Sequence, residues 1–389
     1  MSGGQGVYGR RLLADFALDP GFTHLNQGSF GALPNEVAAA EVRWRRRIES
    51  NPTRFLAFEL PGLMRRTAGE IAAFLGGSAG DWALVENATA GANAVIAALA
   101  LRPGEKLLAT SHVYNAVRNT MRHHAARASA EYVELPVPVP YPGDEALLEQ
   151  VGAALDGRVR IAVFDHVSSH PATILPVRRL VELCHGGGVP VLIDGAHAPG
   201  LLALDVPALG ADWYVGNLHK WAFAPRGTAA LYVAEARRAS LHPPGISHGY
   251  GQGFPLEFDW TGTRDFSGWL AAPEGIGFWR RAGGERLMDR NRALAHAAAE
   301  FLAAEWRTEL AAPAQNLAAM ATIRLPWPGE AGIDQARALF HRLVEEQRIV
   351  APIFSLAGAL WLRISAQIYN EADDYHRLAG AIRRLVQAA

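Results

Sequence analysis

Two segments decide the fold of this chain: VLIDGAHAPG at 191–200 and ADWYVGNLHKWAFAPRGT at 211–228. Each begins with an apolar run that is typical of a buried strand. Asp194 ends the first run, and Lys220 follows shortly after the second. In a parallel sheet, ligands gather at the carboxyl ends of the strands. The spacing therefore predicts that Asp194 and Lys220 point into the same crevice.

Outside these segments, apolar runs alternate with helical patterns from about residue 83 onward. Strands that alternate with helices predict a largely parallel sheet that is covered on both faces. The loop between the last two predicted strands is too short for a helical crossover, so one antiparallel strand is expected. The predicted strands are 82–86, 106–110, 160–165, 189–194, 213–216 and 229–233, and the predicted helices include 35–49, 61–75, 91–101, 115–127, 144–155 and 176–185.

The sequence pattern changes at about residue 275, where long amphipathic helices with a few strands are predicted to begin. This change indicates a smaller α+β unit after the α/β domain. We expect an N-terminal segment (1–34), a large domain (35–275) and a small C-terminal domain (276–389).

Composition limits the classes of protein. The chain has 389 residues, half of them hydrophobic, so it can bury a sizeable core. Its 37 basic and 38 acidic residues provide no overall field for binding nucleic acid or anionic lipid. The basic run at 43–47 is therefore interpreted as a solvated or intersubunit helix face. No apolar stretch reaches the ~18 residues of a membrane span, and we expect no nucleic-acid or membrane partner.

Cysteine and histidine usage adds two further exclusions. Cys184 is the only cysteine, so an intrachain disulfide or a cysteine-based metal cluster is excluded. We interpret Cys184 as a helix-core residue, because HGGG follows it as a helix end. His166 and His170 are too isolated from any group of acidic residues to suggest a metal site, so none is predicted. With no signal-peptide pattern at the N-terminus, these features favour a cytoplasmic enzyme.

Lysine is rare in this chain. Lys106 and Lys220 are the only lysines among the 37 basic residues. Arginine can replace lysine as a surface charge, but it cannot form a Schiff base or act as a neutral amine nucleophile. A lysine that is retained in such a chain is a candidate for chemistry, although a surface lysine is the simpler interpretation of Lys220 taken alone.

A lysine and a carboxylate in one crevice suit the cofactor pyridoxal 5′-phosphate (PLP). Lys220 would form a Schiff base with the aldehyde, and Asp194 would keep the pyridine nitrogen protonated. Taken alone, Asp194 could equally cap a helix or turn. The segment VENATAGANAV at 85–95 leads from a strand through small residues into a helix. The free N–H groups at such a helix start can hold a phosphate.

The residues together resemble a known family. DGAHAPG followed by GNLHKW is similar to the class V group of PLP-dependent enzymes of fold type I, and within it to the isopenicillin N epimerase-like branch, which includes C–S lyases. The likeness extends through THLNQGSFGALP, NATAGANAV, HVYNAV, HVSSHPATILPV, WTGTRD and LRISAQIYN. It implies a mostly parallel seven-stranded sheet, a smaller α+β C-terminal domain, PLP, an amino-acid substrate, and a homodimer with active sites at the interface.

The resemblance also implies roles around the cofactor ring. Lys220 is the Schiff-base lysine, Asp194 pairs with the pyridinium nitrogen, and His197 lies near the phenolic oxygen O3′. His112 matches the residue that stacks on the ring, with Tyr114 beside it. Without the resemblance, a buried core histidine is the simpler interpretation of His112.

Further roles follow at the two ends of the cofactor. Arg363 matches the arginine that binds the substrate carboxylate, Asn26 belongs to the segment over the substrate side, and Ser169 is left open between O3′ and the substrate. An isolated arginine on an apolar strand is unusual, and a bidentate carboxylate partner explains it. The residues that would hold the phosphate are Ala88, Thr89, Asn217 and His219, with Thr263 reaching the phosphate of the neighbouring subunit.

The reaction type stays open among several outcomes. We favour β-elimination from a cysteine-derived conjugate, with epimerisation, transamination or non-catalytic PLP binding as alternatives. A persulfide mechanism of the desulfurase type is disfavoured, because segment 349–363 contains no cysteine. A nicotinamide-dependent dehydrogenase is disfavoured as well, because GGG at 186–188 precedes a strand rather than a helix.

Overall fold

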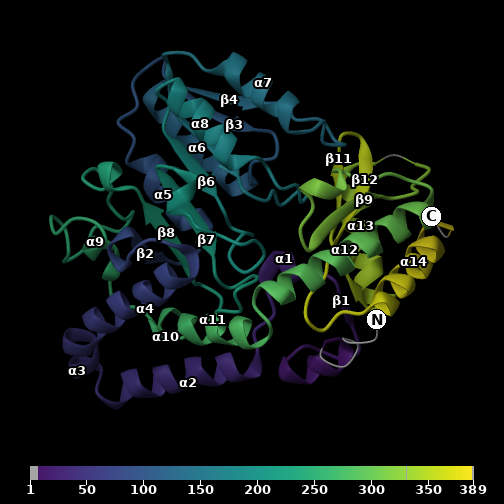
Figure 1. Ribbon diagram of the computed structural model, residues 1–389, viewed down its shortest axis with the longest axis horizontal. Coiled ribbons are helices and arrows are strands. Elements are labelled where there is room, and N and C mark those ends of the chain that lie inside the picture. Colours follow the sequence, from purple (N-terminus) through teal and green to yellow (C-terminus); the bar gives the residue numbers. More distant parts are fainter. Residues whose placement is uncertain (1–7, 330, 388–389) are drawn as a thin grey trace.

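The computed structural model describes residues 8–329 and 331–387. Its centre is a seven-stranded sheet with the order β2-β8-β7-β6-β5-β3-β4 (Figure 1). The five strands from β7 to β4 are parallel, and β8 runs antiparallel to both of its neighbours. This confirms the mostly parallel seven-stranded α/β sheet and the single antiparallel strand. The strands are β2 (Trp82–Val85), β3 (Lys106–Thr110), β4 (Glu131–Leu135), β5 (Val159–Asp165), β6 (Val191–Asp194), β7 (Trp213–Asn217) and β8 (Ala229–Val233).

Helices cover both faces of this sheet, and the central strands β6 and β7 are therefore buried along their whole length. Alternate residues of β3 separate the two layers: Leu107 packs with α5 and α6, whereas Leu108 shares a cluster with α4, α7 and α8. Gly91 lets α5 approach the sheet closely, since a Cβ there would lie 2.6 Å from Cγ2 of Val215. The covering helices are α2 (Asn35–Ser50), α4 (Leu60–Leu75), α5 (Ala88–Ala97), α6 (Asn115–Ala128), α7 (Asp144–Ala154), α8 (Val177–Gly186) and α11 (Ala272–Arg281).

Two local predictions differ from the structure. The helix expected at 91–101 begins earlier, at Ala88, because the Asn87 side chain accepts the backbone N–H of Ala90 at 2.9 Å and caps the first turn. Strand β4 was not named from the sequence pattern. It pairs only with β3 at the edge of the sheet, and its Glu131 and Glu134 break the apolar run. By contrast, Cys184 is fully buried on α8, which confirms the interpretation as a helix-core residue.

The C-terminal part is a second α+β unit (Figure 1). A three-stranded antiparallel sheet, β11-β12-β9, packs against α12. Because α11 packs on α2 and α4 whereas α12 packs on β9 and α14, we propose that the domains divide near Ala282–Gly284, a few residues beyond the expected boundary. The elements are α12 (Glu285–Trp306), β9 (Met320–Arg324), α13 (Ile333–Glu345), β10 (Ile349–Val350), β11 (Ile353–Leu356), β12 (Ala359–Ser365) and α14 (Ala372–Gln387).

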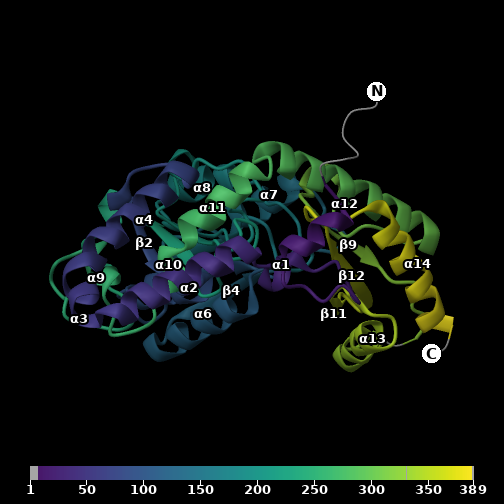
Figure 2. The ribbon, with the colours of Figure 1, turned by 90° about the horizontal axis from the view of Figure 1, so that it is seen from below.

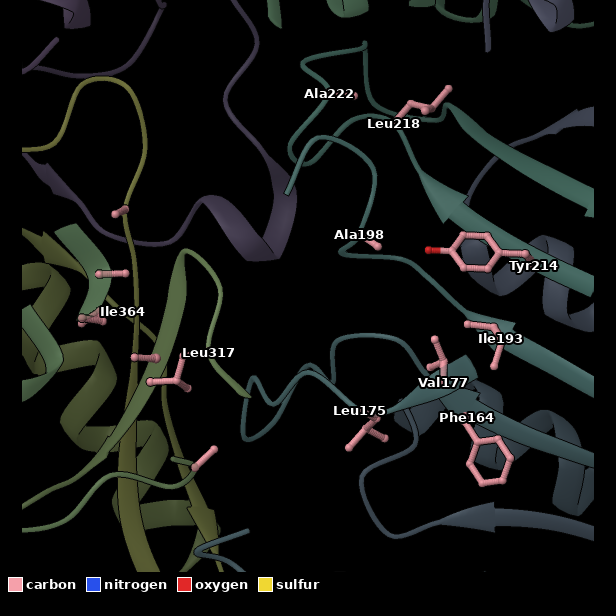
Figure 3. Packing of buried hydrophobic residues seen from close by; sticks show 14 of the residues in the cluster. Phe164, Leu175, Val177, Ile193, Ala198, Tyr214, Leu218, Ala222, Leu317 and Ile364 are labelled. Carbon is pink, nitrogen blue, oxygen red and sulfur yellow. The ribbon is translucent and has the colours of Figure 1, made fainter. Parts of the chain in front are cut away.

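The N-terminal segment joins the two units. Its strand β1 (Thr23–His24) pairs in parallel with β10 of the C-terminal unit. The short helix α1 (Gln27–Phe30) then lies between the units (Figure 2). The largest hydrophobic cluster also spans both units, with Phe164 and Ile193 on one side and Ile364 on the other (Figure 3). The described residues include no helix long and apolar enough to cross a membrane.

Candidate active site

A cavity of about 370 Å³ opens at the carboxyl ends of the central strands, against the N-terminus of α5. It brings together residues that are widely separated in the sequence. Nine residues singled out from the sequence line it: Ala88, Thr89, Tyr114, Ser169, Asp194, His197, Asn217, His219 and Lys220.

Lys220 is buried in this cavity, with Nζ 3.2 Å from Nε2 of His197. Burial, together with the positive charge of Arg363, lowers the pKa of Lys220 to about 7. The side-chain amide of Gln27 donates to the Lys220 carbonyl oxygen and fixes its backbone. Near neutral pH, a large fraction of Lys220 is therefore a neutral amine, the form that attacks carbonyl groups and accepts protons.

The N-terminal segment reaches Lys220 only because Gly31 has no side chain. Gly31 has φ +70°, and a Cβ there would lie 1.9 Å from the carbonyl oxygen of His219. A larger residue would push the segment away from the cavity wall.

Asp194 lies at the end of β6, and only one of its two carboxylate oxygens has a hydrogen-bond partner among the described residues. Oδ1 accepts the backbone N–H of Ala196 at 2.9 Å, whereas buried Oδ2 has no hydrogen-bond partner among the described residues. Burial raises the pKa of Asp194, and the Ala196 hydrogen bond and the charge of Lys220 oppose that rise. An unpaired buried carboxylate oxygen is costly. A cationic N–H group in the cavity would supply the missing partner.

His197 connects these two groups. Its Nε2 faces Lys220, and its buried Nδ1 has no partner among the described residues. Burial, with the nearby charge of Lys220, moves the pKa of His197 well below its ordinary value. The ring is therefore neutral and suited to hydrogen bonding with an oxygen of a bound molecule.

The part of the cavity beside α5 is suited to an anion. The first turn of α5 faces the cavity through Ala88 and Thr89, and Asn217 Oδ1 accepts the Ala88 N–H at 2.9 Å. Nδ1 of His219 lies 3.3 Å from the carbonyl oxygen of Thr228, which orients the ring. A helix N-terminus with such polar neighbours stabilises a phosphate.

Arg363 lies on β12 and is almost completely buried. Nη1 donates to the carbonyl oxygen of Ser169 at 2.7 Å, and Nη2 donates to Oδ1 of Asn26 and Oγ of Ser29 at 3.1 and 2.9 Å. No carboxylate of the described residues forms an ion pair with it, and burial lowers its pKa to about 10. A buried cation among neutral acceptors favours a carboxylate ligand. Asn26 and Ser169 therefore lie on the Arg363 side of the site.

Four of the predicted residues do not line this cavity: Asn26, His112, Thr263 and Arg363. His112 is buried and lines a neighbouring cavity rather than the one that holds Lys220. Tyr114, two residues on, lines both cavities and is 46% exposed. Of these two neighbours only Tyr114 lines the cavity that holds Lys220, and we propose Tyr114 as a residue that faces the cofactor ring. Thr263 is exposed and lies outside the cavity of its own chain.

Asp165 lines the same cavity, although it was not predicted from the sequence as a site residue. Asp165 ends β5 and lies in register with Asp194 on β6. Its Oδ2 is buried without a partner among the described residues, and burial together with the charge of Asp194 raises its pKa well above the ordinary value. Its position at a strand end was the signal that could have identified it.

The cavity offers a buried amine, an unpaired carboxylate oxygen and a helix N-terminus. These three features fit the aldehyde, the pyridine nitrogen and the phosphate of PLP. Fold and site together define a PLP-dependent enzyme of fold type I.

The chain belongs to the aminotransferase class-V family, whose model matches residues 31–378. It is 34% identical over 406 residues to putative L-cysteine desulfhydrase 1 of Oryza sativa subsp. japonica, covering 95% of this chain and 84% of that protein. It is also 34% identical over 390 residues to the isopenicillin N epimerase of Amycolatopsis lactamdurans, covering 95% and 96%. These matches confirm the lyase and epimerase branch and the dependence on PLP.

Solved structures share the same fold. A mutant of C-DES with glycine covalently linked to its PLP cofactor superposes with a TM-score of 0.78 at 21% identity, covering 96% of this chain and 98% of that chain. An identity this low supports the fold alone.

Proposed function

We propose that this protein is a C–S lyase that removes a sulfur leaving group from a cysteine-derived amino acid by β-elimination. The observation that carries the proposal is the buried amine of Lys220, since elimination needs one base beside Cα and a leaving group on Cβ. Epimerisation needs an acid on the opposite face as well, and His112 lies outside the cavity.

The chain's own residues have distinct tasks in this reaction. Arg363 binds the α-carboxylate and so fixes the orientation of Cα. Lys220 removes the Cα proton, the C–S bond breaks with its electron pair on sulfur, and the remaining three-carbon fragment hydrolyses to pyruvate and ammonia. Asp194 holds a proton at the pyridine nitrogen. Bound PLP supplies the electron sink for the charge that develops at Cα.

Sulfur transfer through a persulfide is not part of the proposal. Cys184, the only cysteine, is fully buried on α8, and burial raises the pKa of its thiol to about 12. The β11–β12 hairpin on the C-terminal side of the site contains no cysteine. The leaving group therefore departs as a free sulfur compound.

A specific observation favours epimerisation as the second candidate. Tyr114 lines the cavity with a hydroxyl that can donate a proton. Relatives named for each activity are 34% identical to this chain, which supports keeping epimerisation as the second candidate.

Incubation in deuterated water with a panel of cysteine conjugates decides between the candidates. Pyruvate and ammonia in equal amounts support elimination. Deuterium at Cα of a racemised amino acid, without keto acid, establishes epimerisation instead. Stoichiometric pyridoxamine phosphate with a keto acid establishes transamination. Borohydride reduction followed by peptide mapping should place the pyridoxyl group on Lys220, with Lys106 as the internal control.

We also propose that the active unit is a homodimer in which Thr263 reaches the partner's phosphate site. Its exposure outside its own cavity supports this assignment, as do the exposed apolar side chains of Phe58, Ile246 and Tyr250. Light scattering should give a mass near twice 41.9 kDa. A monomer with full activity would refute the assignment. A cytoplasmic location stays a prediction.

A further inference from the structure

A second cavity of about 230 Å³ adjoins the first, and Tyr114 and Ser169 line both. One wall comes from the large domain, through His112 and His170. The other comes from β11 of the C-terminal unit, through Phe354 and Leu356. None of the chemistry described above uses this cavity.

The contacts of Ser169 show where this second cavity lies relative to the substrate. The carbonyl oxygen and Oγ of Ser169 both accept hydrogen bonds from Nη1 of Arg363, at 2.7 and 3.3 Å. An amino acid whose carboxylate is held by Arg363 therefore lies beside Ser169, at the junction of the two cavities. A substituent on its Cβ has room to extend past Tyr114 into the second cavity.

The walls are suited to a flat apolar group. The rings of His170 and Phe354 meet edge to face with their centroids 4.1 Å apart. Leu356 lies two residues after Phe354 on β11, so both side chains project from the same face of the strand. Both are only half-buried in the structure, although each packs against Trp361 and its neighbours. A ring placed against them would complete their burial.

The formal charge on the cavity wall is also of one sign, which is positive. Arg118 is the only formally charged side chain among the described residues that line it. Its partner Glu134, which accepts from Nε at 2.6 Å, lies outside the lining. The cavity wall therefore presents part of a guanidinium group and no carboxylate, which disfavours a cationic substituent.

We propose that this cavity is a substrate subsite for a planar S-substituent that is uncharged or anionic, such as a benzyl or aryl group on the sulfur of cysteine. The proposal rests on the lyase function and names its substrate class. Size supports it, because a protein cavity of about 150 Å³ already accommodates benzene. Free cysteine would leave the subsite unfilled.

The test compares the holoenzyme on two substrates that share the amino-acid part. S-benzyl-L-cysteine fills the subsite, whereas β-chloro-L-alanine leaves it empty. Leu356→Trp occupies the cavity from the hairpin end, and it should raise the KM for S-benzyl-L-cysteine about tenfold or more, as expected for loss of a buried ring. Turnover of β-chloro-L-alanine by this variant should change less than about twofold. Ile333→Ala, an exposed apolar position on α13, is the matched control and should alter neither.

Substrates whose S-substituents differ in charge provide a second part of the same experiment. S-(4-carboxybenzyl)-L-cysteine should have a KM equal to or below that of the benzyl compound, and the 4-aminomethyl analogue a KM several-fold above it. Arg118→Gln should remove this discrimination. A cationic analogue that binds better than the neutral one would overturn the proposal, and so would equal effects of Leu356→Trp on both substrates.

Failure of the subsite and failure of the lyase function give different results. Pyruvate from β-chloro-L-alanine without any preference for benzyl conjugates refutes the subsite alone. If no substrate yields pyruvate, calorimetric binding of S-benzyl-L-cysteine to wild type and Leu356→Trp still tests the subsite. Equal affinities in that measurement would refute it.

Discussion

Replacing Lys220 by Met should make the cofactor-free protein more stable, in a way that depends on pH. The pKa of Lys220 is lowered from 10.5 to about 7 by burial and by the charge of Arg363. Below pH 7, both the folded and the unfolded chain carry this charge, but the fold holds it at a cost. Met fills a similar volume and carries no charge, so the substitution removes that cost.

The two pKa values set the magnitude. Each pKa unit corresponds to about 1.4 kcal/mol, so the buried charge costs roughly 5 kcal/mol below pH 7. Between pH 7 and 10.5, only the unfolded chain binds the proton, so the free energy of unfolding of the wild type rises with pH. The advantage of Lys220→Met should therefore shrink by about 1.4 kcal/mol for each pH unit between 7 and 9.

Chemical denaturation of both apoproteins at several pH values from 6 to 9 measures this difference. Lys106→Met is the matched control, because Lys106 is the only other lysine and its Nζ forms a surface ion pair with Asp156 at 2.8 Å. Such a pair contributes about 0–1 kcal/mol, so no comparable slope is expected. A pH-independent difference between wild type and Lys220→Met would refute the assignment of a depressed pKa to Lys220.

Three further predictions concern other single residues. Asp194→Asn should retain PLP but lower kcat by about 100-fold or more, measured with saturating substrate, because the pyridine nitrogen loses its anionic partner; wild-type turnover would show that another group protonates the ring. Arg363→Lys should raise the KM of amino-acid substrates by about 10- to 100-fold at unchanged cofactor absorbance, because a point charge cannot reproduce the bidentate fork. Equal wild-type affinity for an amino acid and its decarboxylated amine would contradict the carboxylate clamp. Cys184→Ala should keep full elimination activity, and native Cys184 should resist alkylation at pH 8, since burial raises its pKa to about 12; loss of catalysis in a variant that still folds would revive a sulfur-carrier role.

The sequence predicted those parts of the site that lie close together along the chain or follow directly from a strand end. Asp194 and Lys220 were placed in one crevice because parallel strands bring their carboxyl ends to one edge. The same logic applied to Asp165, but a single acid at a strand end has a simple alternative as a cap, and no nearby lysine marked it. The pairing of β5 with β6 is a long-range contact that the local sequence pattern does not reveal.

His112 and Tyr114 illustrate a different limit. They are two residues apart in a loop after β3, and which of them faces the cavity depends on how the chain turns between Thr110 and Asn115, the first residue of α6. The family resemblance assigned the ring contact to His112 with Tyr114 beside it, and of the two only Tyr114 lines the cavity. The second cavity was equally invisible, because His170 and Phe354 are 184 positions apart and meet only when the two domains pack.

Several energetically unfavourable buried groups lie around the candidate active site. Asp165 Oδ2, Asp194 Oδ2, His197 Nδ1 and Arg363 Nε are all buried without hydrogen-bond partners among the described residues. Lys220 adds a buried amine whose protonated form is destabilised. Such groups each cost about 1–3 kcal/mol, and they persist in a fold only where the surrounding packing over-determines them. The pyridinium of PLP would supply a cationic partner for Asp194 and an amino-acid substrate a carboxylate for Arg363, so their binding would offset part of this cost. Cofactor affinity and protein stability are therefore linked through these residues, and a variant that stabilises the apoprotein by removing one of them should bind its ligand more weakly.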